Sequence, residues 1–213
     1  MIDFKCAIFD LDGTVLDSTD IWTEIDIEFF AQRGMALPEG YGKTIAPMGF
    51  ERAAEYTVNT YNLKETPQEV VAVWNKMSHD KFKNKVRLKP GAGEYIRYLK
   101  SNGVVLCIAT ASQEDMFMPA LENNGIADLF DYVTTLKEVE RGKGFPDIYL
   151  KAAEKAGFAV EECVVFEDLL AGVKGAKDGR FYTVAMYDKN SQKDIEKIKI
   201  AADKLIYNFK ELM

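Results

Sequence analysis

The sequence is poor in the residues that build nucleic-acid surfaces and metal–sulfur sites. Its 213 residues include one histidine and three cysteines, and lysine and arginine form no dense run. Acidic residues outnumber basic ones by 34 to 27, which gives a formal net charge of -7. Proteins bind a phosphate backbone through clustered positive charge, so we expect no nucleic-acid partner.

Long apolar runs are missing as well. The segment Met1-Ile2-Asp3-Phe4-Lys5 places an acid early, and only a short apolar stretch follows it. This pattern indicates neither a signal peptide nor a membrane span. The cysteines fall in separate apolar runs, which is typical of small buried side chains rather than of a disulfide framework or a zinc site. We expect a cytoplasmic monomer without a membrane partner.

The chain does contain enough apolar residues, 47% of the total, for one full core and a subdomain. Short β-like runs occur at residues 6–9, 104–109, 132–134, 163–166, 181–185 and 205–207. Helical patterns separate most of them, which favours parallel strands joined by helices. The predicted fold class is therefore α/β, with a doubly wound, mainly parallel Rossmann-like sheet.

The region between the first strand and Leu88 has a different pattern. It contains no clear β run, and its apolar residues recur at helical spacing. Thr66-Pro67-Gln68-Glu69 is a strong helix start, because a capping threonine is followed by a proline and by a glutamate three residues on. We predict an inserted α-helical cap at residues 17–85, and a catalytic core formed by residues 1–16 and 86–213. The cap would act as a lid over the carboxyl edge of the sheet.

The most informative motif, Asp10-Leu11-Asp12-Gly13-Thr14, follows the first predicted strand. Residues two apart in a strand share a face, so Asp10 and Asp12 point the same way. Gly13 permits a turn, which presents both acids at the carboxyl end of the strand, where open α/β sheets bind ligands. Two close carboxylates repel each other unless a cation or proton lies between them, and oxygen ligands of this kind suit magnesium.

Three later strand ends supply complementary groups. The second strand ends at Thr110-Ala111-Ser112, whose hydroxyls and backbone N–H groups can bind phosphate oxygens. Lys143 lies on a loop ahead of a helix and could neutralise a phosphate. Glu167 and Asp168 follow another buried run, and we expect them to face the first two acids in an oxygen-rich metal site.

These four elements occur in the same order, and at strand ends, as in the haloacid dehalogenase-like hydrolases, which the chain resembles over nearly its whole length. The helical insert resembles the small α-helical cap of that superfamily. Asp17-Ser18 after the turn and Gly172 after the acidic pair are most similar to the β-phosphoglucomutase and phosphoglycolate phosphatase branch.

The resemblance implies a role for each matching residue. Asp10 would be the nucleophile that forms an aspartyl-phosphate, and Asp12 would protonate the leaving oxygen and then activate water. Thr110, the following Ala111 and Lys143 would hold the phosphoryl oxygens. Dehalogenases that attack carbon lack the second acid, so the presence of Asp12 favours phosphoryl transfer.

The resemblance also implies a Mg²⁺ cofactor. Asp168 would bind the ion beside the Asp10 carboxylate and the Asp12 backbone carbonyl. Glu167 would be a ligand either directly or through water. The metal and the lysine would offset the charge of an anionic nucleophile that meets an anionic phosphate.

The sequence departs from the family pattern in three places. Lys143 is not followed directly by proline, and Arg180 stands where many relatives have glycine. Trp22 lies at about the place where sugar-phosphate mutases carry a cap histidine, and His79 is the only histidine. This last departure favours hydrolysis over mutase activity.

Each motif alone has a simpler explanation. Asp12-Gly13 can be a plain turn, Thr110 can cap a helix, and Lys143 can be a solvated loop charge. In the cap, Lys43 and Arg52 can contact substrate or simply be solvated.

The combination of these motifs predicts a magnesium-dependent phosphatase that acts on a small phosphorylated metabolite, such as a sugar phosphate. The alternatives are a β-phosphoglucomutase-type phosphomutase and a non-enzymatic phospho-aspartate switch, although a switch of the receiver type has no inserted lid.

Overall fold

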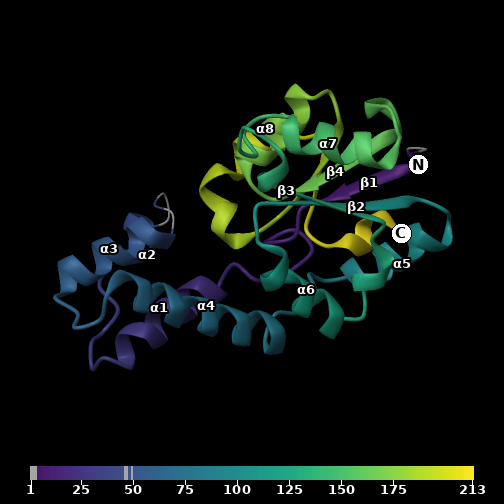
Figure 1. Cartoon of the computed structure of the whole chain (residues 1–213). Helices are drawn as coiled ribbons and strands as arrows, with labels where there is room; N and C mark the ends of the chain where they lie inside the picture. Colours follow the sequence, from purple (N-terminus) through teal and green to yellow (C-terminus); the bar gives the residue numbers. More distant parts are fainter. Residues whose placement is uncertain (1–3, 46–47, 49) are drawn as a thin grey trace. The chain divides into compact units, whose positions relative to one another are not determined.

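A computed structural model describes residues 4–45, 48 and 50–213 (Figure 1). Its six-stranded parallel sheet has the order β3-β2-β1-β4-β5-β6. The strands are β1 (Cys6–Phe9), β2 (Val105–Thr110), β3 (Tyr132–Thr135), β4 (Cys163–Glu167), β5 (Tyr182–Met186) and β6 (Lys204–Ile206). Successive strands run outward on both sides of β1, so the order reverses between β1 and β4. In an open parallel sheet, this reversal point is where ligands bind. The predicted fold class is confirmed.

Helices cover both faces of this sheet, and its central strands β1 and β4 are buried along their whole length. Figure 1 shows α5 and α6 on one face and α7 and α8 on the other. The helices of this unit are α5 (Ala92–Ser101), α6 (Glu114–Asn123), α7 (Asp147–Ala156), α8 (Leu170–Asp178) and α9 (Ile195–Ala201). Short 3-10 turns lie at Ala127–Leu129, Leu136–Glu138, Val160–Glu162, Lys189–Asp194 and Phe209–Leu212.

The two faces of β1 are buried in two different ways. Cys6 and Ile8 join an apolar cluster that includes Tyr149 of α7. Phe9, on the opposite face, stacks on Phe166 with 4.5 Å between ring centroids. All three cysteines are buried and free, as the sequence predicted. The central strands are thus fixed from both sides, and the residues that directly follow them are held with them.

The helical insert forms a second compact unit. Grouping by contacts divides the chain into Met1–Asp17 with Val86–Met213, and Ser18–Lys85. The second unit contains α1 (Ile21–Ala31), α2 (Tyr41–Ile45), α3 (Phe50–Tyr61) and α4 (Pro67–Asn84). The predicted capping box at α4 is present: the Glu69 N–H donates to Thr66 Oγ1 at 3.3 Å, and the Thr66 N–H donates to Glu69 Oε2 at 2.7 Å.

Within the α/β unit, the two segments that lead to and from the insert run side by side. Leu16 forms an antiparallel bridge with Leu88. The Asp17 N–H donates to the Arg87 carbonyl, and the Lys89 N–H donates to the Val15 carbonyl, both at 2.8 Å. The two tethers of the helical unit are therefore hydrogen-bonded to each other.

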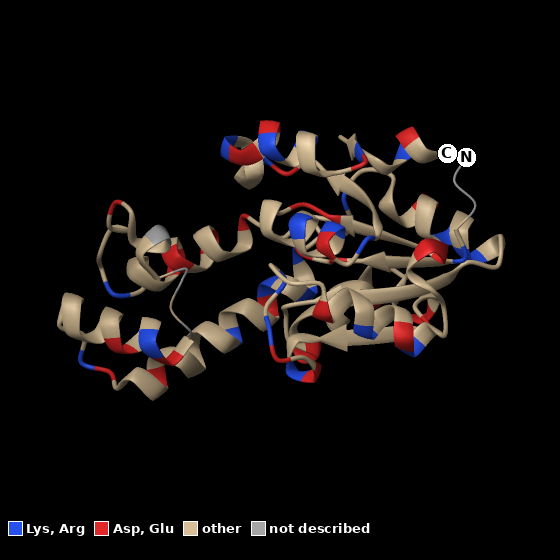
Figure 2. Ribbon diagram, turned by 90° about the horizontal axis from the view of Figure 1, so that it is seen from above, with Lys and Arg blue, Asp and Glu red and all other residues tan. Residues whose placement is uncertain are grey.

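Two properties of the structure concern the distribution of charged residues and the length of its apolar helices. Lysines and arginines are interspersed with acidic residues along the ribbon (Figure 2). Among the helices that the structure describes, none combines the length and apolarity needed to cross a membrane.

Candidate active site

The first acidic motif begins where β1 ends. Asp10 stays aligned with β4, because its N–H donates to the Phe166 carbonyl at 3.0 Å. Gly13, at φ +85°, then turns the chain, and the Leu16 N–H returns to the Leu11 carbonyl at 2.8 Å. A residue with a Cβ adopts such a positive φ only at a cost. Asp10 is buried by this turn, whereas Asp12 is half-buried.

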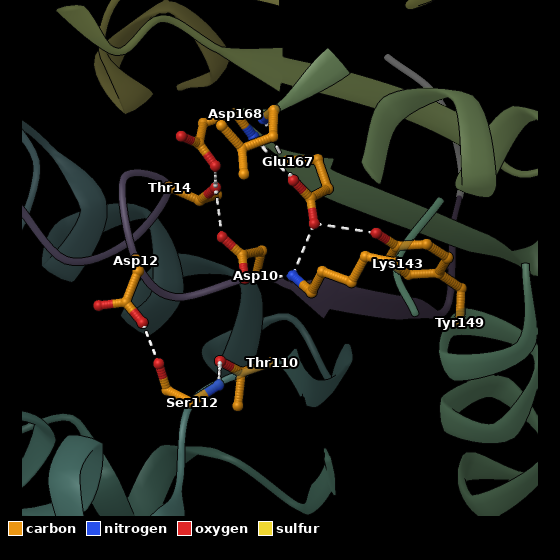
Figure 3. Close-up of polar contacts among 10 residues, drawn as sticks. Asp10, Asp12, Thr14, Thr110, Ser112, Lys143, Tyr149, Glu167 and Asp168 are labelled. Carbon is orange, nitrogen blue, oxygen red and sulfur yellow. Dashed lines mark hydrogen bonds and ion pairs between the residues drawn. The ribbon is translucent and has the colours of Figure 1, made fainter. Parts of the chain in front are cut away.

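Three carboxylates meet at the carboxyl ends of the two central strands. Because Phe9 pairs with Phe166 in the parallel register, the residues that follow these strands become neighbours. Asp10, Glu167 and Asp168 are all buried, and one oxygen of each lies within 4.8 Å of the others (Figure 3). Of the four acids expected at this site, three therefore form the cluster, and the Asp12 side chain is not part of it.

Lys143 supplies the positive charge that contacts this cluster. Its Nζ donates to Asp10 Oδ1 and, at 2.6 Å, to Glu167 Oε1 (Figure 3). Burial alone would lower the pKa of Lys143, but the two carboxylates outweigh burial and raise that pKa above its ordinary value. Lys143 is therefore a cation. One ammonium beside three carboxylates still leaves negative charge uncompensated.

Asp168 has an oxygen with capacity for a further ligand. The Thr14 hydroxyl lies 3.0 Å from Asp10 Oδ2 and 3.3 Å from Asp168 Oδ1. Asp168 Oδ2 is buried and has no hydrogen-bond partner among the described residues. Burial raises the pKa of both Asp10 and Asp168. An unpaired buried carboxylate oxygen in an electron-rich cluster fits a hard divalent cation such as Mg²⁺.

Glu167 is instead committed to hydrogen bonds within the protein. Its Oε1 accepts from the Tyr149 hydroxyl at 2.9 Å as well as from Lys143. Its Oε2 accepts from the N–H groups of Asp168, at 3.1 Å, and Leu169, at 3.3 Å. Glu167 thus orients the lysine and joins α7 to the end of β4.

Asp12 lies on a different side of Asp10, toward the end of β2 (Figure 3). The Ser112 hydroxyl donates to Asp12 Oδ2, and the Ser112 N–H donates to Thr110 Oγ1 at 3.1 Å. A cavity of about 100 Å³ adjoins this turn and is lined by Ala111, Ser112, Gln113, Glu114, Thr135, Leu136 and Lys137. The predicted phosphate-binding turn therefore adjoins the half-buried acid.

Two glycines of α8 allow close packing against the site. A Cβ at Gly172 would lie 2.3 Å from Glu167 Cδ, and a Cβ at Gly175 would lie 2.2 Å from the Lys143 carbonyl oxygen. Both distances are far below van der Waals contact. The small residues of α8 therefore let the helix approach both the glutamate and the lysine loop.

The structure brings together most of the residues that the sequence singled out. Asp10, Lys143, Glu167 and Asp168 are linked by contacts, and Asp12 is linked to Thr110 through Ser112. Arg52 lies exposed on α3 of the helical unit. Lys43 lies on α2, and its side chain is outside the described part of the structure.

Sequence reasoning missed three side-chain contacts. The sequence singled out Thr14 only as part of a motif and Ser112 only as one of several hydroxyls, and it did not single out Tyr149. Tyr149 is buried, and its hydroxyl contacts Glu167. A tyrosine rather than a phenylalanine on an apolar face was the available signal, since a buried hydroxyl needs a partner.

Comparisons with known proteins agree with this geometry. A sequence profile described as "Haloacid dehalogenase-like hydrolase" matches residues 7–186. Hexitol phosphatase B of Escherichia coli K12 is 26% identical over 88% of this chain and 86% of that protein. The phosphorylated carbohydrates phosphatase of Thermotoga maritima is 24% identical over 81% and 80%, respectively. The fold is similar to that of CbbY from Rhodobacter sphaeroides in complex with phosphate, with a TM-score of 0.79, 20% identity, and coverage of 98% of this chain and 96% of that one.

Proposed function

The chain belongs to the haloacid dehalogenase-like hydrolases, and on that premise we propose that it is a magnesium-dependent phosphatase acting on a small phosphorylated metabolite through an aspartyl-phosphate. The observation that carries the proposal is the contact of Asp10 with Lys143 beside the unpaired buried oxygen of Asp168. A carboxylate nucleophile, a fixed cation and an open metal position are the components that phosphoryl transfer to an aspartate requires.

Asp10 and Asp12 divide the chemistry between them. A carboxylate oxygen of Asp10 attacks phosphorus as the bond to the leaving alcohol breaks, and Asp12 gives its proton to that alcohol oxygen. Asp12 then takes a proton from the water that attacks the aspartyl-phosphate, which releases phosphate and restores Asp10. The separate placement of Asp12, half-buried and bonded to Ser112, supports its role in proton transfer.

Lys143 and the end of β2 bind the transferred group. The Lys143 ammonium, already within hydrogen-bond distance of Asp10, offsets the charge of the phosphoryl oxygens that approach this carboxylate. Thr110 shapes the turn by accepting the Ser112 N–H, and the turn around Ala111 offers backbone donors to the phosphate.

The metal would be held mainly by Asp10 and Asp168. Asp168 Oδ2 has the free capacity, the Asp12 backbone carbonyl would be a third ligand, and Glu167 would act through water because its oxygens already accept four hydrogen bonds. When bound, Mg²⁺ supplies charge stabilisation to the phosphoryl oxygens.

A sugar phosphate is the substrate class that we propose. Support comes from the printed names of two relatives, hexitol phosphatase B and a phosphatase of phosphorylated carbohydrates. In this proposal residues 17–85 are the cap, and Arg52 and Lys43 contribute to substrate selectivity from it. Arg52 is exposed and has the charge to contact an anionic or hydroxylated substrate.

A phosphomutase is the second candidate, because Asp10 and Asp12 would serve it equally well. Mutase activity also needs a group that helps return the phosphoryl group to the sugar. At the place expected for a cap histidine, Trp22 packs edge-on against Phe50, with 5.7 Å between ring centroids. An indole neither accepts nor releases a proton at neutral pH, so we favour hydrolysis.

The test is phosphate release from a panel of phosphorylated metabolites, with Mg²⁺ and with excess EDTA. We expect steady release from at least one sugar phosphate, and loss of this release in EDTA that added Mg²⁺ reverses. Asp10→Asn should abolish release, and an exposed control, Asp178→Asn, should keep it. Full activity in excess chelator or in Asp10→Asn would contradict the proposal, and isomerisation of β-glucose 1-phosphate as fast as its hydrolysis would identify a mutase.

A further inference from the structure

The loop that carries Lys143 has little backbone restraint of its own. Glycine stands on both sides of the lysine, and Gly144 takes the place of the proline that follows the lysine in the family pattern. A Cβ at Gly142 or Gly144 would meet nothing within 4 Å, and neither residue has a positive φ. Neither space nor backbone conformation requires these glycines, and they leave the loop more conformational freedom than other residues would. The position of the Lys143 ammonium therefore depends on contacts that hold the loop to the rest of the protein.

One such contact is an ion pair that spans the lysine. Arg141 Nε and Nη2 donate to the two carboxylate oxygens of Asp147 at 2.9 and 2.7 Å. The Arg141 guanidinium also lies over the Phe145 ring, 4.5 Å from its centroid. A residue before Lys143 thus contacts two residues after it. A bidentate pair of this kind fixes direction as well as distance, which an ordinary exposed ion pair does not.

Asp147 anchors this pair to a helix. It is the first residue of α7, where the amino end of the helix favours a carboxylate. The hydrogen bond from Arg141 is the main reason why the pKa of Asp147 lies below its ordinary value, so the pair stays ionised at neutral pH. The same helix supplies Tyr149, whose hydroxyl contacts Glu167, the second partner of Lys143. Helix α7 is thus joined both to the backbone of the lysine loop and to one acceptor of its ammonium.

Helix α8 restrains the loop in a different way. A Cβ at Gly175 would lie 2.2 Å from the Lys143 carbonyl oxygen and 2.8 Å from the Phe145 carbonyl oxygen, so the helix and the loop backbone are in direct contact. A packing contact resists movement toward α8 alone. The two hydrogen bonds between Arg141 and Asp147 resist any movement that separates the loop from α7.

We propose that Arg141 and Asp147 are positioning residues of the phosphatase site, which together place Lys143 for the transferred phosphoryl group. They act through the backbone of the loop and not by contact with the reacting atoms. A lysine side chain is a point charge on a flexible stem, so an error in the position of its backbone reaches the ammonium. This inference rests on the proposed function, in which Lys143 binds phosphoryl oxygens, and adds two residues outside the acidic cluster on which the rate depends.

The test compares Arg141→Gln, Asp147→Asn and the double variant. The measured quantities are kcat for para-nitrophenyl phosphate and the inhibition constant of inorganic phosphate. We expect each single variant to lower kcat and to raise the inhibition constant, each by about tenfold, because a misplaced ammonium binds phosphoryl oxygens poorly. The double variant should be no worse than either single variant, because the two residues act as one pair. Loss of folded protein would lower kcat alone, since an inhibition constant does not depend on the active fraction.

Arg141→Lys separates the geometry of the pair from its charge. Lysine keeps the positive charge but cannot form the bidentate contact, so we expect this variant to behave like Arg141→Gln. The matched control is Lys151→Gln, which removes an exposed ion pair of the same helix, between Lys151 and Glu154 at 2.8 Å. It should leave both constants within about twofold of the native values.

Amide hydrogen exchange measures the loop without turnover. The Phe145 N–H donates to the Gly142 carbonyl at 3.0 Å, and we expect it to exchange faster in Arg141→Gln but not in Lys151→Gln. Native constants in either single variant or in Arg141→Lys, additive losses in the double variant, or unchanged Phe145 exchange would each overturn the proposal. A native protein that releases no phosphate would refute the proposed function itself, whereas losses confined to the variants bear only on the pair.

Discussion

At the scale of single residues, Gly172 controls the position of Glu167. An alanine methyl would overlap the Glu167 carboxylate, which Lys143, Tyr149 and two backbone N–H groups hold in place. The carboxylate must move, and Lys143 then loses one of its two partners. We predict that Gly172→Ala keeps the fold but lowers kcat for para-nitrophenyl phosphate by about 100-fold, the cost of a misplacement on the ångström scale.

The matched control for this prediction is Gly142→Ala. It adds the same methyl group one residue from Lys143, where a Cβ meets nothing within 4 Å and φ is not positive. We expect its kcat to stay within about twofold of the native value, because the methyl group displaces no group of the site. Similar kcat values for the two variants would show that Gly172 has no such role.

The pH dependence of stability is set partly by Asp26. Burial raises the pKa of Asp26 to about 6 from an ordinary 3.8. Between these values the folded protein holds a proton that the unfolded chain has lost, so the free energy of unfolding falls as pH rises from about 4 to 6. We predict that Asp26→Asn matches the native stability near pH 4 and exceeds it by about 2–3 kcal/mol at pH 7.

Urea unfolding at several pH values measures this difference. Comparison of two proteins that differ at one residue cancels the other titrating groups. A stability difference that does not change between pH 4 and pH 7 would mean that Asp26 is paired or solvated in the folded state.

At the scale of elements, the end of α8 has an unusual residue. The Arg180 N–H donates to the Lys177 carbonyl at 2.9 Å, and the Phe181 N–H donates to the Ala176 carbonyl at 3.1 Å. This is the Schellman pattern, in which the left-handed position is usually glycine. Here Arg180 occupies it at φ +66°. The sequence departs from the family pattern at Arg180, where many relatives have glycine. The positive φ explains why glycine is favoured at this position.

Replacing Arg180 should therefore stabilise the protein only when glycine is introduced. The left-handed backbone costs a residue with a Cβ about 1–2 kcal/mol, part of which the entropy of glycine cancels. We predict that Arg180→Gly raises the free energy of unfolding by about 0.5–1 kcal/mol. Arg180→Ala removes the same side chain but keeps the strain, and should have little effect in the same denaturation assay. Equal stability of the two variants would exclude this explanation.

The elements themselves could largely be predicted from the sequence. Strands such as β1 and β4 are apolar on both faces, and their flanks carry clear turn residues, so their bounds differ from the prediction by at most one residue. The family expected from the four motifs is also confirmed. The contacts of Ser112 and Tyr149 could not be predicted, because they join residues far apart in the chain. The burial of Asp26 could not be predicted, because it depends on how the helices pack and not on the local sequence pattern.

At the scale of the whole molecule, the paired tethers are suited to a hinge. The Asp17 N–H donates to the Arg87 carbonyl, and the Lys89 N–H donates to the Val15 carbonyl. The Lys89 ammonium pairs with Asp188 at 2.6 Å and with Asp17 at 3.2 Å. Movement of residues 18–85 would thus need changes at only a few backbone positions. We predict that Mg²⁺ with beryllofluoride and a well-fitting substrate or product lowers the radius of gyration in solution scattering. Superimposable curves with and without these ligands would speak against a moving cap.

The central claim, that Asp10 carries the phosphoryl group, is tested most directly by trapping it in Asp12→Asn. With para-nitrophenyl phosphate, whose leaving group needs little protonation, Asp10 should still be phosphorylated. Water should then attack slowly because the base is missing. We predict that acid quenching and borohydride reduction convert Asp10 to homoserine, identified by mass spectrometry of the peptide, and that the Asp10→Asn/Asp12→Asn double variant shows no such product. An unmodified Asp10 after nitrophenol release, or modification of another residue, would contradict the account.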